Sequence, residues 1–166
     1  PEDLQKFLER LPEFDAIFYK SLARNDHQWA DTHKSHQSGV LIPRRYVPFF
    51  GLTEIPSENS TLDLDVTWLL DGDSYRRSDM TYTGGANQTR LKYYCGGNRA
   101  NRPEAHLTCV YNPYFEDLES GALFLIGRLS SIEDRFVAIV IGPEKGPLID
   151  TAVDAHWKAE VGTERT

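Results

Sequence analysis

The chain has 166 residues, 40% of them hydrophobic and 26% charged, which is the composition of a globular domain and not of a fibre or a disordered tail. Its net charge of −7, taken as a whole, disfavours nucleic acid, anionic lipid and acidic substrates as partners. The longest unbroken apolar run, Phe136–Ile141, is much shorter than the roughly 20 residues of a membrane helix, so we expect no membrane partner. The sequence predicts a single domain over residues 1–166.

Two features bear on where the protein works. The chain begins at Pro1 with no signal or transit pattern, which favours a domain excised from a longer cytoplasmic protein. It has only two cysteines, Cys95 and Cys109, as expected in a reducing compartment. Whether the two cysteines pair stays open.

Hydrophobic spacing predicts a helix at each end of the chain. The first ends at Pro12, and its apolar residues recur at helical intervals, namely Leu4, Phe7, Leu8 and Leu11. A closing helix is expected over Leu148–Glu160, and a short one from Pro43 to Phe50 that ends at Gly51.

Short apolar stretches between these helices predict a β-rich core. The clearest is Leu62–Leu70, where Leu62, Leu64, Val66, Trp68 and Leu70 alternate with mostly polar residues. The other expected strands are Ile17–Tyr19, Val40–Ile42, Ser74–Thr83, Thr89–Cys95, His106–Tyr111, Gly121–Leu129 and Arg135–Ile141. Many short strands with turn residues between them are typical of a small barrel or sandwich.

Basic residues are gathered in two segments of this acidic chain. Lys20–Phe49 holds five basic and two acidic residues, and Met80–Pro103 holds four basic residues and no acidic one. If the segments lie together, they form a positive face on an acidic body, as expected of a protein that binds the phosphate backbone of DNA. Two unrelated solvated loops would have the same composition, so charge alone leaves both interpretations open.

The motifs of common enzymes are absent. No Asp or Glu stands two residues before any lysine, so the usual D/E-x-K site of metal-dependent nucleases is missing. His156 and Lys158 match the start of the H-x-K-x4-D motif of phospholipase D-like nucleases, but Thr163 occupies the place of the Asp. There is no P-loop, G-x-S-x-G or G-x-G-x-x-G stretch. We predict no catalytic residue and no cofactor in this chain.

A metal site is also disfavoured. His27, His33 and His36 form an H-x5-H-x2-H pattern, and Cys95 and Cys109 are too far apart in sequence for a C-x2-C zinc knuckle. Solvent-facing or phosphate-contacting histidines are the favoured interpretation over zinc ligands.

Four stretches of the chain match the motifs of one known family. Phe18–Asp26 and His36–Pro43 are similar to the pattern Y-x-K-x-L-x-x-N-D followed by H-Q-x-G-x-x-I-P. Asn87–Leu91 resembles the segment R-N-E-x-R-I, and Glu119–Leu123 resembles the segment N-T-G-A-L. The matches span about residues 18–125 and follow the family's order, so the chain resembles the DNA-binding domain at the N-terminus of the restriction endonuclease EcoRII and its relatives.

This resemblance implies a mainly β fold with flanking helices, a seven-stranded B3-like pseudobarrel with two protruding arms. It implies sequence-specific binding of double-stranded DNA in the major groove. The arms would be Lys20–Ser38 and Thr83–Arg99, the places where the basic residues gather. A closer match within this family, to a bacterial restriction endonuclease of type IIS, further implies a parent chain that carries a separate phospholipase D-like nuclease domain. Whether the parent is a homodimer through that domain stays open.

The arms would also carry the side chains that contact DNA. Arginine donates two hydrogen bonds to guanine, Asn and Gln pair with adenine, Asp accepts from cytosine, and lysines suit phosphates. On this basis we predict DNA contacts by Lys20, Arg24, Asn25, Asp26, Lys34, His36, Gln37, Asn87, Gln88, Thr89, Arg90, Lys92 and Arg99. Gln88, Thr89 and Leu41 differ from the family's residues at these places, so the EcoRII target sequence is not carried over.

Two alternatives remain open from the residues alone. Arg24–Asp26 could form a turn in which Asp26 binds nearby backbone. The whole chain could be a β-domain that binds a protein or carbohydrate through its polar and aromatic loops, which the net charge of −7 favours. The DNA hypothesis requires both basic segments to project from one side of the barrel.

Overall fold

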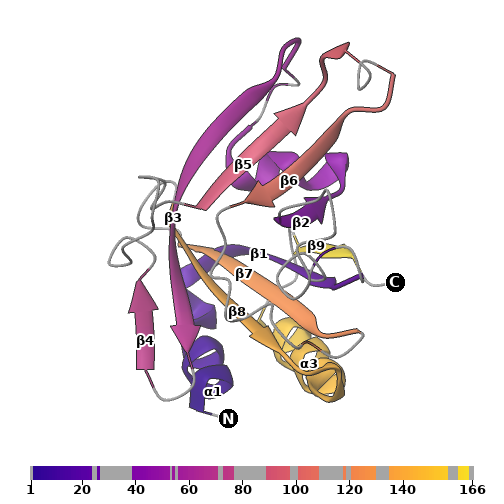
Figure 1. The fold of residues 1–166 in the computed structure, drawn as a ribbon. Coiled ribbons are helices and arrows are strands. Elements are labelled where there is room, and N and C mark those ends of the chain that lie inside the picture. The colour runs from indigo at the N-terminus through magenta and orange to yellow at the C-terminus, as the bar shows by residue number, and fades with distance from the viewer. Residues whose placement is uncertain are drawn as a thin grey trace.

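A computed structural model of the chain describes residues 2–23, 26, 39–52, 54, 56–70, 73–76, 89–97, 101–108, 118, 121–129, 135–156 and 161–164. Over these ranges the fold is mainly β, a curled sheet with a few short helices (Figure 1). The helices are α1 (Glu2–Glu9), η1 (Leu11–Glu13), η2 (Arg44–Phe50), η6 (Pro143–Lys145) and α3 (Gly146–His156). Among the described residues, no helix has the length and apolar character needed to cross a membrane.

The described strands pair into one sheet. They are β1 (Phe14–Ser21), β2 (Gly39–Ile42), β3 (Ser60–Leu70), β4 (Asp73–Arg76), β5 (Thr89–Tyr94), β6 (Glu104–Thr108), β7 (Leu123–Leu129), β8 (Arg135–Ile141) and β9 (Val161–Glu164). Their order is β2-β6-β5-β3-β8-β7-β1-β9, and β4 pairs with β3. The run from β2 to β1 is the predicted seven-stranded pseudobarrel sheet, and β9 and β4 add to it. Of the two predicted arms, the structure describes residues 20–23, 26 and 89–97, and Lys20, Ser21 and Thr89–Tyr94 of these lie in strands β1 and β5 of the sheet.

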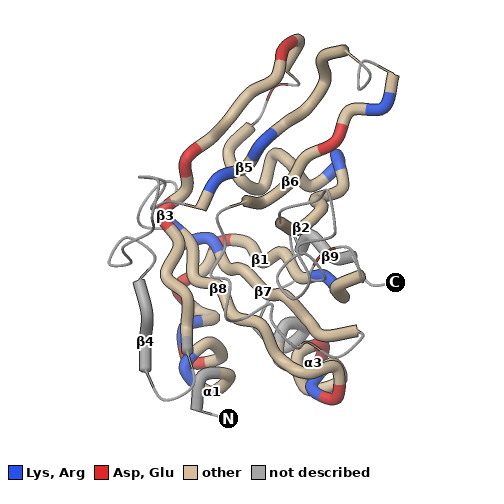
Figure 2. Tube along the Cα trace, viewed as in Figure 1, with Lys and Arg blue, Asp and Glu red and all other residues tan. Residues whose placement is uncertain are grey.

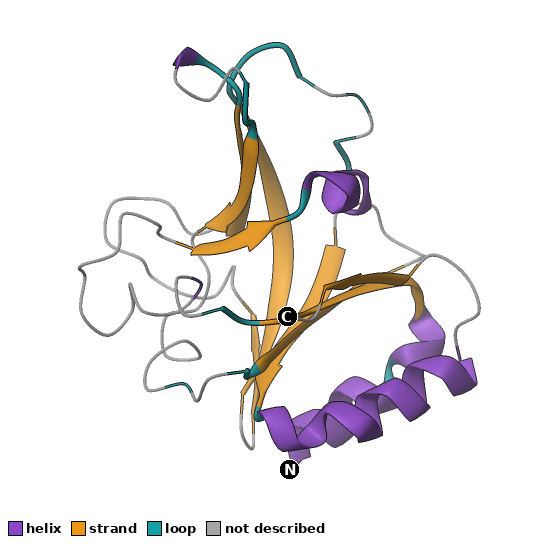
Figure 3. Ribbon diagram, turned by 90° about the vertical axis from the view of Figure 1, so that its right-hand side faces the viewer, coloured by secondary structure: helices purple, strands orange, loops and turns teal. Residues whose placement is uncertain are grey.

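The long strand β3 joins the two parts of this sheet. Its first half, Ser60–Leu64, pairs antiparallel with β5, and Asp65–Trp68 pairs parallel with β8. The upper part therefore contains β2, β6 and β5, and the lower part contains β8, β7 and β1 (Figure 1). The side view shows that α1 and α3 cover the lower part on the side away from η2 (Figure 3).

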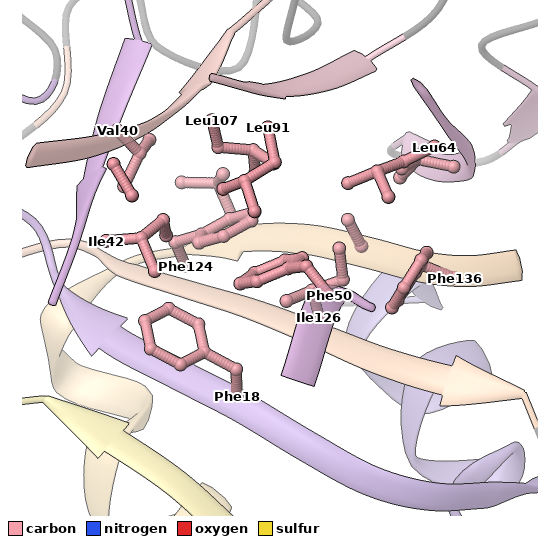
Figure 4. Close-up of a cluster of buried hydrophobic side chains, with 14 of the residues drawn as sticks. Phe18, Val40, Ile42, Phe50, Leu64, Leu91, Leu107, Phe124, Ile126 and Phe136 are labelled. Atoms are coloured by element: carbon pink, nitrogen blue, oxygen red, sulfur yellow. The ribbon is translucent and has the colours of Figure 1, made fainter. Parts of the chain in front are cut away.

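The main hydrophobic core fills the inside of the curled sheet. Phe18, Phe50, Phe124 and Phe136 converge there from β1, η2, β7 and β8 (Figure 4). Trp68, which is fully buried, stacks on Phe124 with ring centroids 5.9 Å apart. The predicted alternation of β3 is confirmed for Leu64, Val66 and Trp68, which all join this core. Burying these large side chains is the dominant favourable term for the fold.

A second hydrophobic cluster lies under the two α-helices. Phe7 and Leu11, from the N-terminal segment, pack with Val137 and Ile139 of β8 and with Ile149 of α3. Strand β8 is thus buried on both faces, which is why its sequence is an unbroken apolar run and not an alternating one.

Each predicted helix and strand has a counterpart among the described residues, in the predicted order. Residues 77–83, 109–111 and 157–160 of the predicted elements lie outside the described residues, and α1 ends at Glu9, before the predicted end at Pro12. The short helix after Pro43 is a 3-10 helix that ends at Gly51, whose φ of 111° is the left-handed conformation that glycine accepts most readily. Strand β9 was not predicted, because Val161–Glu164 contains a single apolar residue; it forms by adding to the edge of β1.

Candidate nucleic-acid interface

Each basic segment contains a strand of the sheet, β2 or β5, and the two strands begin at neighbouring levels of the sheet. The first returns at Gly39, which begins β2, and the second returns next to Arg90 in β5. Both residues pair with Thr108 of β6, which lies between them. Strands β2 and β5 run in the same direction, since each is antiparallel to β6. The segments therefore reach the sheet from the same end.

The spacing of these joining points suits a DNA groove. Neighbouring strands lie about 4.8 Å apart, so two strand spacings separate the joining points by about 10 Å. The major groove of B-DNA is about 12 Å wide. The sheet thus holds the returning ends of the two segments at a separation comparable with one major groove.

Alternation along β5 decides which of its side chains face outward. Thr89, Leu91 and Tyr93 are buried, whereas Arg90 and Lys92 are partly exposed. Figure 2 shows basic positions along β5 next to acidic positions on β3. Arg90 and Lys92 are therefore the predicted contacts that the structure places on an accessible face.

Arg90 is held by a neighbouring carboxylate. It lies opposite Asp63 of β3, and its Nε donates a 2.9 Å hydrogen bond to Asp63 Oδ1. The side chains are 34% and 55% exposed, so the pair lies on the surface. Lys92 lies opposite Thr61 and His106, and within the described residues no carboxylate pairs with it.

The structure gives Lys20 and Asp26 a different role from the predicted one. Their side chains are 6% and 2% exposed and form an ion pair with 2.9 Å between Lys20 Nζ and Asp26 Oδ2. Lys20 Nζ also donates to the carbonyl oxygen of Leu41 at 2.8 Å. Asp26 accepts from the backbone N–H groups of Ala23 and Leu41. These contacts occupy both charges inside the protein and do not support direct contact with DNA.

Thr89 is likewise unsupported as a DNA contact. Its side chain is fully buried on the core side of the sheet, and its Oγ1 accepts a hydrogen bond of 3.4 Å from Trp68 Nε1. The hydroxyl serves to satisfy the indole N–H in the core.

The remaining predicted contacts lie outside the described residues. They are Arg24, Asn25, Lys34, His36, Gln37, Asn87, Gln88 and Arg99. His27 and His33 of the zinc alternative and Cys109 also lie outside them, while Cys95 carries a free thiol. Within the part of the chain that the structure describes, no group of three His, Cys, Asp or Glu side chains could hold a metal ion.

Sequence reasoning missed Asp63 and His106 as members of this face. Asp63 belongs to an acidic segment, and His106 binds Glu104 with 3.0 Å between His106 Nε2 and Glu104 Oε2. The alternation of β3 does predict that Asp63 faces outward. Its pairing with Arg90 depends on the register between two strands, which no local pattern encodes.

Comparison with known proteins identifies the fold. No family model matches the chain, and no curated protein matches it. Six chains of solved structures do match. One is the B3 domain of the UbaLAI restriction endonuclease, a mutant crystallised with cognate DNA, with a TM-score of 0.52 and 19% sequence identity over 98% of this chain and 96% of that chain. The protein has a B3-like fold.

Proposed function

We propose that this domain binds double-stranded DNA at a specific sequence, through the major groove, and leaves cleavage to a separate domain. The observation that carries the proposal is the return of both basic segments to one row of a B3-like sheet, about 10 Å apart by two strand spacings. The UbaLAI B3 domain, which is similar in fold, was crystallised with cognate DNA, which supports the same partner here.

The roles of the residues follow from their chemistry and placement. Arg90 reads a base, together with Arg24, Asn25, His36, Gln37, Asn87 and Gln88 of the arms. Lys92 contacts a phosphate, together with Lys34 and Arg99. We assign a structural role inside the protein, without DNA contact, to Lys20, Asp26 and Thr89.

A finer proposal concerns the parent protein. The resemblance of residues 18–125 to restriction-enzyme DNA-binding domains supports a type IIS restriction endonuclease of the BfiI kind, in the bacterial cytoplasm. In such an enzyme this domain reads a short asymmetric site, and a phospholipase D-like nuclease domain of the same chain forms the dimer and cuts.

The test is a selection from random duplexes with the 166-residue domain, followed by sequencing of the retained DNA. We expect enrichment of one short asymmetric site, with affinity that falls steeply as salt rises. Retention of all duplexes without enrichment would contradict sequence-specific binding. Salt-insensitive binding to a glycan or peptide, with no retention of DNA, would favour the alternative of a β-domain for such ligands.

Replacing Lys92 with alanine is expected to weaken binding to all duplexes alike. A lysine that neutralises a phosphate releases one counterion, so the slope of log K against log salt should become shallower by about 0.9. Base preference in the selection should stay as in the unmodified domain, because a phosphate contact reads no sequence. Titrations of the selected site and of an unrelated duplex at several salt concentrations measure both quantities. A change of preference at one base pair would instead make Lys92 a base contact.

A further inference from the structure

The ion pair between Asp63 and Arg90 fixes one side of the guanidinium and leaves the other side available. Asp63 Oδ1 accepts from Arg90 Nε at 2.9 Å. Within the described residues, the two terminal nitrogens of Arg90 donate to no other group. Those nitrogens form the planar fork that donates two parallel hydrogen bonds to guanine O6 and N7. Asp63 thus restrains the guanidinium through Nε, on a partly exposed side chain, and leaves this fork without a partner among the described residues.

The charge of Asp63 also affects what Arg90 can contact. The carboxylate is 55% exposed and lies beside the guanidinium, so an approaching phosphate meets a like charge there. A guanine edge is neutral and offers two acceptors, so it does not suffer this repulsion. The pair is therefore better suited to a base edge than to the backbone.

We propose that Asp63 is a positioning residue that commits Arg90 to a guanine edge and disfavours contact with phosphates. This inference rests on the proposed function and deepens it, because it assigns sequence discrimination to a side chain from an acidic segment that lies outside both arms.

The chain offers a matched control on the same strand. Asp65, two residues further along β3, pairs with Arg135 of β8 with 3.2 Å between Arg135 Nε and Asp65 Oδ2. The side chains of Arg135 and Asp65 are 44% and 39% exposed. Asp63→Asn and Asp65→Asn therefore remove the same charge from similar surface pairs, one of which holds Arg90. Exposed ion pairs contribute little to folding, so both variants should fold.

The experiment measures the affinity of four variants for the selected site and for sites with each base pair changed in turn. The variants are Asp63→Asn, Arg90→Ala, their double mutant and Asp65→Asn. Arg90→Ala should lose about 5- to 150-fold of the discrimination at one base pair. Asp63→Asn should lose at least about fivefold at that same pair, and the double mutant should match Arg90→Ala, because the two residues act as one unit. Asp65→Asn should keep all discrimination.

The outcomes separate this inference from the proposed function. If Asp63→Asn behaves like Asp65→Asn, with equal changes in affinity for every duplex, the positioning role is refuted and sequence-specific binding stands. If losses from Asp63→Asn and Arg90→Ala add at different base pairs, the two residues act separately and the inference is also refuted. If the unmodified domain retains no duplex, the proposed function fails and the inference fails with it. Thermal melting of each variant checks that it is folded.

Discussion

Replacing Asp26 with alanine is expected to destabilise the domain by about 3–5 kcal/mol, because it leaves the buried ammonium of Lys20 without its counter-ion. The Lys20 side chain is only 6% exposed, so water cannot replace the lost carboxylate. The backbone N–H groups of Ala23 and Leu41 lose their acceptor at the same time. Globular domains unfold at a cost of about 5–15 kcal/mol, so this one change removes a large share of the total.

Urea unfolding measures the effect. Lys20→Met should also destabilise, since it removes the buried ammonium that pairs with the Asp26 carboxylate. The double variant Lys20→Met/Asp26→Asn should lose less than the sum of the single losses, because it buries no lone charge and keeps an amide oxygen to accept from backbone. A loss below about 1 kcal/mol for Asp26→Ala, the size typical of exposed pairs, would show that the pair is not buried in solution.

The elements that sequence predicts well are those with a local pattern. Leu4, Phe7 and Leu8 recur at helical spacing because one face of α1 packs on β8, and that spacing is visible without the partner strand. The alternation of β3 is equally visible, because one face of the strand lies in the core. Leu69, on the opposite face, is also buried, since α1 covers that part of the sheet.

Interactions between distant segments could not be predicted in this way. Residue type suggested that Lys20 and Asp26 contact DNA, yet the fold turns both inward onto Leu41, 15 residues beyond Asp26. The alternative in which Asp26 binds nearby backbone is confirmed, because its carboxylate accepts from the N–H of Ala23, while Arg24 and Asn25 lie outside the described residues. The Asp63–Arg90 pair joins residues 27 positions apart and requires the register of β3 against β5. The stretches that resemble restriction-enzyme domains therefore include residues that stabilise the fold as well as candidates for DNA recognition.

Gly39, within the H-Q-x-G resemblance, is one of the residues that stabilise the fold. Replacing it with alanine is expected to destabilise the domain by about 1–3 kcal/mol. A Cβ at this position would collide with the carbonyl oxygen of Leu107 in β6, a backbone atom that cannot move aside without opening the β2–β6 pairing. Because Gly39 is where the first basic segment rejoins the sheet, the same variant should also lose affinity for the selected duplex.

Gly96→Ala is the matched control for this prediction. It adds the same methyl group just beyond β5, where the nearest atom would be Asn59 Oδ1 at 3.4 Å, the end of a side chain. Its unfolding midpoint in urea should stay near that of the unmodified domain, while the midpoint of Gly39→Ala falls. Equal midpoints for the two variants would mean that β2 and β6 are not packed so closely. The presence of glycine in the H-Q-x-G stretch would then have to be explained by DNA recognition and not by close packing of β2 against β6.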